Sequence, residues 1–183
     1  ADYKKVTKNA AVQKGLFTTL YNAKEGKLYF EIPDSAFGRT YILANRVAAT
    51  SNTRDFVAGQ IATQPLLIRF SKDERNVYIH QIQSSDIVAG TDPIESAFDK
   101  NFYDPVLKGF KIAAQNGKNV VIDVTAFFGA NEKAISPIKT DNPLSKLLGG
   151  ANSLKGTFVP DASGIVSSKC FPENIEIKSR LSF

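Results

Sequence analysis

The sequence predicts a β-rich α+β protein, built largely from antiparallel hairpins with one or two short helices. Three observations predict this fold class. Apolar and polar residues alternate with period two in many stretches, as they do in half-buried strands. Turn residues such as Asn116-Gly117 separate neighbouring stretches, and residues 92–103 have apolar side chains at helical spacing. The chain has 183 residues, of which 43% are hydrophobic and 22% charged, enough for one sizeable globular domain.

The N-terminal residues 1–14 are polar and lysine-rich, so we expect a loosely attached basic arm or a short helix there. Residues 15–183 are expected to form a single β-rich domain. Its first hairpin pairs a strand within residues 15–22 with a strand that begins at Lys27, through a turn that contains Gly26.

Residues 27–48 form the centre of the predicted sheet. Leu28, Phe30 and Ile32 alternate with Tyr29 and Glu31, which is typical of a half-buried strand. Pro33-Asp34-Ser35 ends that strand, and Gly38 supplies a turn position. Residues 40–47 are almost continuously apolar, as in a strand covered on both faces. We therefore expect strand, tight connection and strand in the middle of a sheet.

A small and polar stretch at residues 48–64 predicts a long loop of functional or mobile character. Pro65 then opens a strand with Leu66, Ile68 and Phe70 on one face, and a charged turn at residues 71–76 leads into its partner strand. This pair is the clearest hairpin in the sequence.

Asp92-Pro93-Ile94-Glu95 predicts a helix start, with Asp92 as the cap, Pro93 at the first helical position and Glu95 completing a capping box. Strands follow at residues 110–114 and 120–124, joined by the Asn116-Gly117 turn. Residues 129–163 predict a long surface excursion that holds one short helix candidate, PLSKLLG. Residues 175–183 alternate strictly up to the last residue, which predicts an amphipathic strand in a domain truncated at its C-terminal end.

The net charge of +5 does not indicate a nucleic-acid partner, because Lys and Arg are interleaved with Asp and Glu. No apolar run approaches the roughly 20 residues of a membrane-spanning helix. Cys170 is the one cysteine, so an intrachain disulfide is impossible. This fits a reducing compartment or an exported protein that folds without disulfides. We expect Cys170 to be a small buried residue rather than a reactive thiol.

The residues that carry chemistry are sparse, so no catalytic, metal or binding residue is assigned. His80 is the one histidine, which excludes a His-Glu-x-x-His zinc motif in this chain. A Ser-His-Asp triad is arithmetically possible, but no Gly-x-Ser-x-Gly motif exists, and we expect His80 to face solvent or a cross-strand neighbour. Asp123 ends a strand, where it could act as an acid, and we expect it to cap the following turn. Gly149-Gly150 lacks the spacing of a phosphate-binding loop.

Three stretches in order carry a family resemblance: KGLFTTLYNAKEGKLYFEIPDSAFGRTYILANRVA, then AGQIATQPLLIRFSKDERNVYIHQ, then the pair VVIDVTAFFG and FPENIEIKSRLSF. Together they resemble the N-terminal region of a family of large, exported, zinc-dependent metallopeptidase-like proteins of Gram-negative bacteria. In that family, two adjoining domains of unknown function precede a catalytic domain with His-Glu-x-x-His. The resemblance covers nearly the whole chain from about Lys14 onward, and the family's zinc ligands fall beyond Phe183.

The resemblance implies a non-catalytic N-terminal domain of a secreted or periplasmic metallopeptidase-like protein, without a cofactor on this chain. Its partners would be the parent's catalytic domain, on which it packs to shape the substrate cleft, and a protein or peptide substrate. The implied location is periplasmic, outer-membrane-associated or extracellular. A free-standing protein- or glycan-binding module that uses the loops at 48–64 or 129–163 is the alternative. A hydrolase in its own right is disfavoured by the single histidine and the absent motifs.

Overall fold

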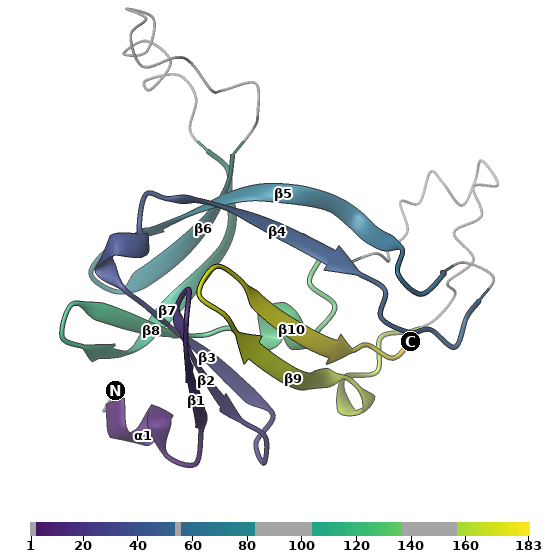
Figure 1. Ribbon diagram of the computed structural model, residues 1–183, viewed down its shortest axis with the longest axis horizontal. Coiled ribbons are helices and arrows are strands. Elements are labelled where there is room, and N and C mark those ends of the chain that lie inside the picture. The colour runs from purple at the N-terminus through teal and green to yellow at the C-terminus, as the bar shows by residue number, and fades with distance from the viewer. Residues whose placement is uncertain (1–2, 54–55, 83–103, 137–156) are drawn as a thin grey trace, which may run out of the picture.

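The computed structural model describes residues 3–53, 56–82, 104–136 and 157–183, and it has the β-rich architecture that the sequence predicts. An eight-stranded antiparallel sheet is accompanied by a two-stranded hairpin and two short helices (Figure 1). The elements are α1 (Tyr3–Thr7), β1 (Ala11–Lys14), β2 (Thr18–Asn22), β3 (Lys27–Ile32), β4 (Thr40–Arg46), β5 (Ile61–Lys72), β6 (Asn76–Ile82), β7 (Val106–Asn116), β8 (Asn119–Asp123), α3 (Thr125–Gly129), β9 (Gly164–Cys170) and β10 (Ile175–Arg180), with 3-10 turns at Asp34–Ala36 and Pro160–Ala162.

The strand order of the large sheet is β1-β2-β3-β8-β7-β6-β5-β4. The expected hairpins β2–β3, β5–β6 and β7–β8 are all present and antiparallel. The β7–β8 connection is a tight turn in which Gly117 has a φ of 60°, a left-handed conformation that favours glycine. Local alternation and turn chemistry were therefore sufficient to predict these three pairs.

The sheet curls around an aromatic core, in which Phe17 contacts strands from both halves of the sheet. The Phe17 ring lies 5.8 Å from Phe30 of β3, 5.5 Å from Tyr41 of β4 and 5.7 Å from Phe70 of β5, measured between ring centroids. All three contacts are edge-on, the favoured geometry for aromatic pairs. Because β3 and β4 are far apart in the strand order, Phe17 connects the sheet across its concave side rather than along it.

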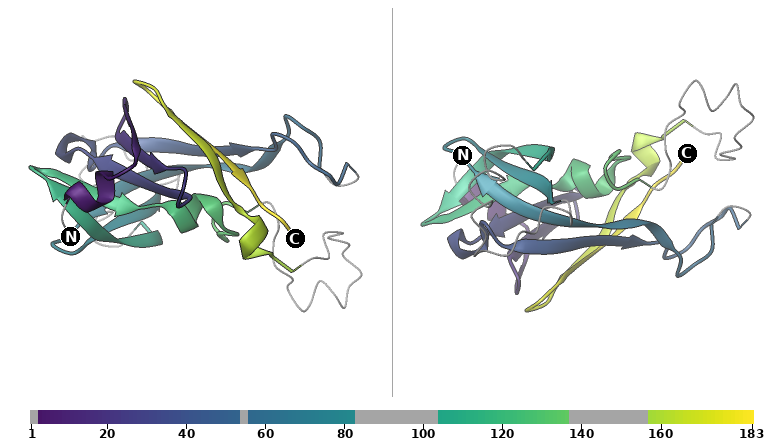
Figure 2. Two further views of the ribbon diagram at one scale, coloured as in Figure 1. Left: turned by 90° about the horizontal axis from the view of Figure 1, so that it is seen from below. Right: turned by 90° about the horizontal axis from the view of Figure 1, so that it is seen from above.

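The β9–β10 hairpin runs obliquely across the strands of the larger sheet (Figure 2). Its inner side chains, including Ile165, Ile175 and Ile177, pack against the main core. The hairpin tip is fixed by a backbone hydrogen bond from Leu16 N to Phe171 O at 2.7 Å. Gly15 makes this approach possible, since a Cβ built there would lie 2.3 Å from the same carbonyl oxygen.

The prediction for residues 40–47 is wrong in two respects. β4 does not lie in the middle of the sheet but forms one of its edges, at the far end from β3. It is also not covered on both faces, since its exposure alternates and Ile42 is 72% exposed. The continuous apolar run has a different cause, because one face of β4 supplies Tyr41 and Leu43 to the core and the other face carries apolar side chains in solvent.

Two further boundaries differ from the sequence-based expectation. Residues 11–14 are not part of a loose arm, because they pair with β2 as strand β1, and the short helix α1 precedes them. β5 begins at Ile61 rather than at Pro65 and runs through the proline. A β-bulge opposite Ala44 explains this, because a proline that donates no hydrogen bond is tolerated where the ladder is interrupted.

The predicted helix at residues 92–103 and the helix candidate PLSKLLG lie outside the described residues. The expected C-terminal strand is confirmed over Ile175–Arg180 as β10. Within the described part of the chain, no helix is long and apolar enough to cross a membrane.

Candidate functional site

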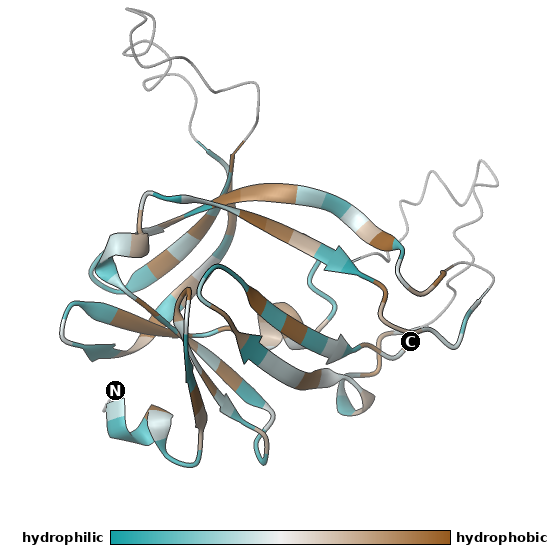
Figure 3. Ribbon diagram, in the orientation of Figure 1, coloured by the Kyte–Doolittle hydropathy of each residue, from teal (hydrophilic) through white to brown (hydrophobic). Residues whose placement is uncertain are grey.

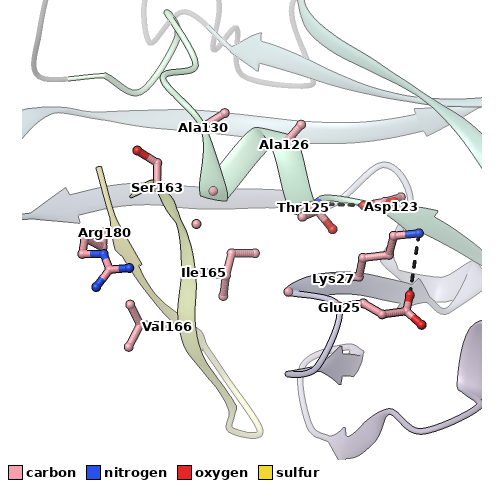
Figure 4. Close-up of a pocket in the computed structure, with 13 residues that line it drawn as sticks. Glu25, Lys27, Asp123, Thr125, Ala126, Ala130, Ser163, Ile165, Val166 and Arg180 are labelled. Carbon is pink, nitrogen blue, oxygen red and sulfur yellow. Dashed lines mark hydrogen bonds and ion pairs between the residues drawn. The ribbon is translucent and has the colours of Figure 1, made fainter. Parts of the chain in front are cut away.

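An open cleft of about 570 Å³ lies where the β2–β3 turn, helix α3 and the β9–β10 hairpin meet (Figure 4). Its charged and hydroxyl-bearing residues are Glu25, Lys27, Asp123, Thr125, Ser163 and Arg180. Most of its other lining residues are small, including Gly26, Ala126, Gly129, Ala130 and Gly164. The cleft thus combines charges of both signs with small side chains.

Helix α3 is held at the cleft by contacts to β3. Thr125 Oγ1 accepts a hydrogen bond from Leu28 N at 2.9 Å, and Val124 N donates to Leu28 O at 3.0 Å. Phe127 points into the core and is 1% exposed, while Ala126 and Gly129 of the same short helix line the cleft. On the next turn, a Cβ built on Gly129 would lie 3.3 Å from the Ile165 side chain, so a small residue lets β9 approach α3 closely.

Each charged group of the cleft has a partner within the described residues. Lys27 Nζ lies 3.8 Å from Glu25 Oε2, an exposed ion pair on the β2–β3 turn. Asp123 Oδ1 accepts a hydrogen bond from Thr125 N at 2.9 Å, which confirms the expected capping role of Asp123. Arg180 Nε donates to Ala162 O at 3.2 Å.

His80 lies on the outer face of β6, where it contacts a cross-strand neighbour as expected. Its Nε2 is 2.7 Å from Ser71 Oγ on β5, and its Nδ1 is 3.1 Å from the main-chain oxygen of Asp104. A carbonyl oxygen only accepts, so Nδ1 carries the proton and Nε2 accepts from the serine hydroxyl in neutral imidazole. A catalytic triad places a carboxylate at Nδ1. Here the Asp104 carboxylate instead lies 3.5 Å from Arg69 Nη1.

Cys170 is half-buried at the end of β9, and its Sγ donates to Phe17 O at 3.3 Å. It therefore contributes to the junction between the hairpin and the β1–β2 segment. Across residues 3–53, 56–82, 104–136 and 157–183, no group of three or more His, Cys, Asp or Glu residues is placed to hold a metal ion.

A buried carboxylate at Glu31 is the polar feature that sequence reasoning missed. Alternation in β3 placed Glu31 opposite the core face, yet it is only 4% exposed. Its Oε2 accepts from Tyr3 Oη at 2.7 Å, and its Oε1 accepts from the side-chain amides of Asn116 and Asn119, each at 2.9 Å. These partners are 28 to 88 residues away in the chain, so no local pattern could have identified them.

The Glu31 cluster has clear electrostatic consequences. Burial raises the pKa of Glu31, but the hydrogen bonds from Asn119, Tyr3 and Asn116, together with the charge of Lys14, outweigh burial and lower the pKa below its ordinary value. Burial, followed by the hydrogen bond to the carboxylate, raises the pKa of Tyr3 to about 12. The cluster thus joins α1 to β3 and to both ends of the β7–β8 turn.

The fold is an antiparallel β-sheet protein with an open cleft that is lined by both charged and apolar residues. Residues 59–183 match the family described as "Domain of unknown function (DUF5117)", and the chain belongs to this family. Residues 1–50 match the family described as "Domain of unknown function (DUF5118)". No curated protein and no solved structure gave a significant match. Strands from both matched segments form one sheet, since β1–β4 begin within the first segment and β5–β8 lie in the second.

Proposed function

We propose that this chain is a non-catalytic N-terminal domain of a secreted or periplasmic zinc metallopeptidase-like protein. In this proposal the domain packs on the parent's catalytic domain and forms one wall of the substrate cleft. The zinc ion would belong to the parent's catalytic domain, and the substrate would be a protein or peptide. The ordered resemblance of three sequence stretches to that family supports the proposal.

One structural observation carries the substrate-binding part of the proposal. The walls of the cleft come from both family-matched segments, with Glu25 and Lys27 from the first and Asp123 and Arg180 from the second. Both segments thus line one cleft, which supports a shared role on one ligand. An open cleft with small side chains and charges of both signs has room for an extended peptide.

A substitution that blocks the cleft tests whether it binds substrate in the natural full-length protein. Val166 lines the cleft and is 52% exposed, so Val166→Arg adds bulk and charge without opening the core. Val12 of β1 is 51% exposed and does not line the cleft, which makes Val12→Arg the matched control. We expect Val166→Arg to raise the KM for peptide hydrolysis about five- to tenfold, and Val12→Arg to leave it unchanged, because only the first removes ligand contacts.

Two results would contradict the proposal. The first is a natural reading frame that does not continue past Phe183 into a His-Glu-x-x-His segment. The second is an unchanged KM in Val166→Arg when the variant melts at the wild-type temperature.

The alternative is a free-standing protein- or glycan-binding module, which the same open cleft could also serve. Screening the isolated chain against peptide and glycan arrays distinguishes the two. Retention of one ligand class that Val166→Arg abolishes, with no peptidase segment in the natural reading frame, would establish the alternative.

A further inference from the structure

The edges of the two sheets differ in how well they are protected against pairing with another strand. β1 is short, with four residues, and is flanked by the lysines of the N-terminal segment. The outer positions of β10 carry Glu176, Lys178 and Arg180. Short strands and charged side chains are the usual means by which proteins keep sheet edges from associating.

β4 lacks this protection. Its residues from Thr40 to Asn45 are uncharged and contain no proline, and Ile42 is 72% exposed. Figure 3 shows the strand brown over its middle and teal at its arrowhead. Within the described residues, β4 pairs with β5 alone, and no backbone hydrogen bond reaches its outer edge.

The outer edge of β4 is also regular enough to accept a strand. The β4–β5 ladder has two register shifts, after Leu43 and after Asn45. From Leu43 to Asn45, β4 advances two residues while β5 advances three, from Leu66 to Thr63, so the extra residue lies in β5. The same holds at the second shift. β4 itself alternates without interruption over its whole length.

Two arginines bracket this edge. Arg39 directly precedes β4 and Arg46 ends it, and both side chains are exposed. Neither makes an ion pair within the part of the chain that the structure describes. An uncharged strand with an exposed cation at each end matches an extended segment that carries a carboxylate at each end.

We propose that the outer edge of β4 is a docking site for an extended partner segment with an uncharged, alternating apolar centre and acidic residues at both ends. The segment adds a ninth strand to the eight-stranded sheet, with backbone hydrogen bonds along β4 and ion pairs to Arg39 and Arg46. This inference concerns a different surface from the cleft and does not depend on the peptidase proposal.

A second copy of this chain is a poorer occupant. Antiparallel pairing of β4 with β4 of another copy places Arg39 near Arg46 of that copy at both ends of the new ladder. Like charges facing each other across a ladder destabilise it. The arginines therefore select against self-pairing and in favour of an acidic partner.

The test uses the whole 183-residue chain and a fluorescein-labelled peptide, Glu-Val-Thr-Val-Thr-Val-Glu with capped ends, measured by fluorescence anisotropy at low salt. A carboxylate at each end makes the probe suitable for either strand direction. A peptide with Lys in place of both Glu residues is expected to bind about tenfold more weakly, since two exposed attractions become repulsions. The double variant Arg39→Glu/Arg46→Glu is expected to reverse this preference, whereas Arg75→Glu on the exposed β5–β6 turn leaves it unchanged.

Strand addition is tested on the wild-type protein with two N-methylated versions of the acidic peptide. In an extended peptide, alternate amides point to opposite edges. One version is methylated at the amides of one edge, and the other version at the amides of the opposite edge. One of them is expected to lose binding, because it removes the donors that face β4, while the other still binds. Equal binding of both methylated peptides, or no binding of the acidic peptide, would overturn the proposal. A concentration-dependent dimer that Ile42→Lys abolishes would overturn the choice of partner and assign the edge to a second copy.

Discussion

The buried carboxylate of Glu31 allows a quantitative test of how α1 and the β7–β8 turn are attached to β3. In Glu31→Gln, the amide oxygen can still accept from Asn116 and Asn119, and the amide nitrogen can donate to Tyr3 Oη. The three pairs of atoms can therefore still form hydrogen bonds, but none of these bonds involves a charged group any longer. A hydrogen bond to a charged group contributes about 1 kcal/mol more to stability than a neutral one. Glu31→Gln loses this contribution, but it also removes the cost of burying a charge, which offsets part of the loss. We expect a loss of about 1–2 kcal/mol in the free energy of unfolding at pH 7.

The pH dependence gives the sharper readout. Because folding lowers the pKa of Glu31, the stabilisation is present above the ordinary pKa of 4.5 and is lost as the pH falls through the folded value. The difference between wild type and Glu31→Gln should therefore shrink from pH 7 to acid pH. Urea unfolding at a series of pH values measures this, with Glu25→Gln on the exposed β2–β3 turn as the control. A difference that stays constant with pH, or a Gln variant as stable as wild type at pH 7, would refute the reasoning.

Three other predictions concern the hairpin junction, the core and metal content. Gly15→Ala places a Cβ against the Phe171 carbonyl and should lower the free energy of unfolding by about 1–3 kcal/mol. Gly109→Ala is the control, because its Cβ would meet the Tyr78 ring at an ordinary contact distance of 3.4 Å and should cost less. Thermal melts compare the two variants. Ile122→Asp buries an unpaired charge at a position with 0% exposure and should prevent folding. His80→Ala removes two hydrogen bonds and should lower the free energy of unfolding by only about 1 kcal/mol. Thermal melts followed by circular dichroism compare the two variants, and a larger loss of stability in His80→Ala would contradict the prediction. The chain purified without chelator or His-tag should hold well under one zinc per molecule by elemental analysis, and a stoichiometric value would contradict this.

Sequence reasoning succeeded where the signal is local. The β7–β8 hairpin has alternating strands on both sides of Asn116-Gly117, and the register confirms Asn116 opposite Asn119. It also predicted the capping contact of Asp123, whose partner is two residues away. Both depend on residues that are neighbours in the chain, so the pattern and its cause lie in the same short stretch.

The candidate cleft could not be predicted in the same way. Asp123 was considered as a possible acid because it ends a strand. Nothing in the sequence indicates that Lys27 and Arg180 lie near it. The three residues come from separate elements that meet only because the β9–β10 hairpin packs against α3 and the β2–β3 turn. The hairpin is held there by contacts such as Leu16 N to Phe171 O, which join residues at opposite ends of the chain.

By itself, the sequence determined the fold class, the hairpins and the faces of most strands, because period-two burial and turn conformations are properties of consecutive residues. The tertiary structure decided which strands became neighbours. It placed β4 at an edge although it follows β3 directly, and it buried Glu31 on a face that alternation had assigned to solvent. Alternation shows that two faces differ, but what covers each face depends on segments distant in the chain. Phe17, in contact with both β3 and β4, shows how the curl of the sheet makes those segments neighbours.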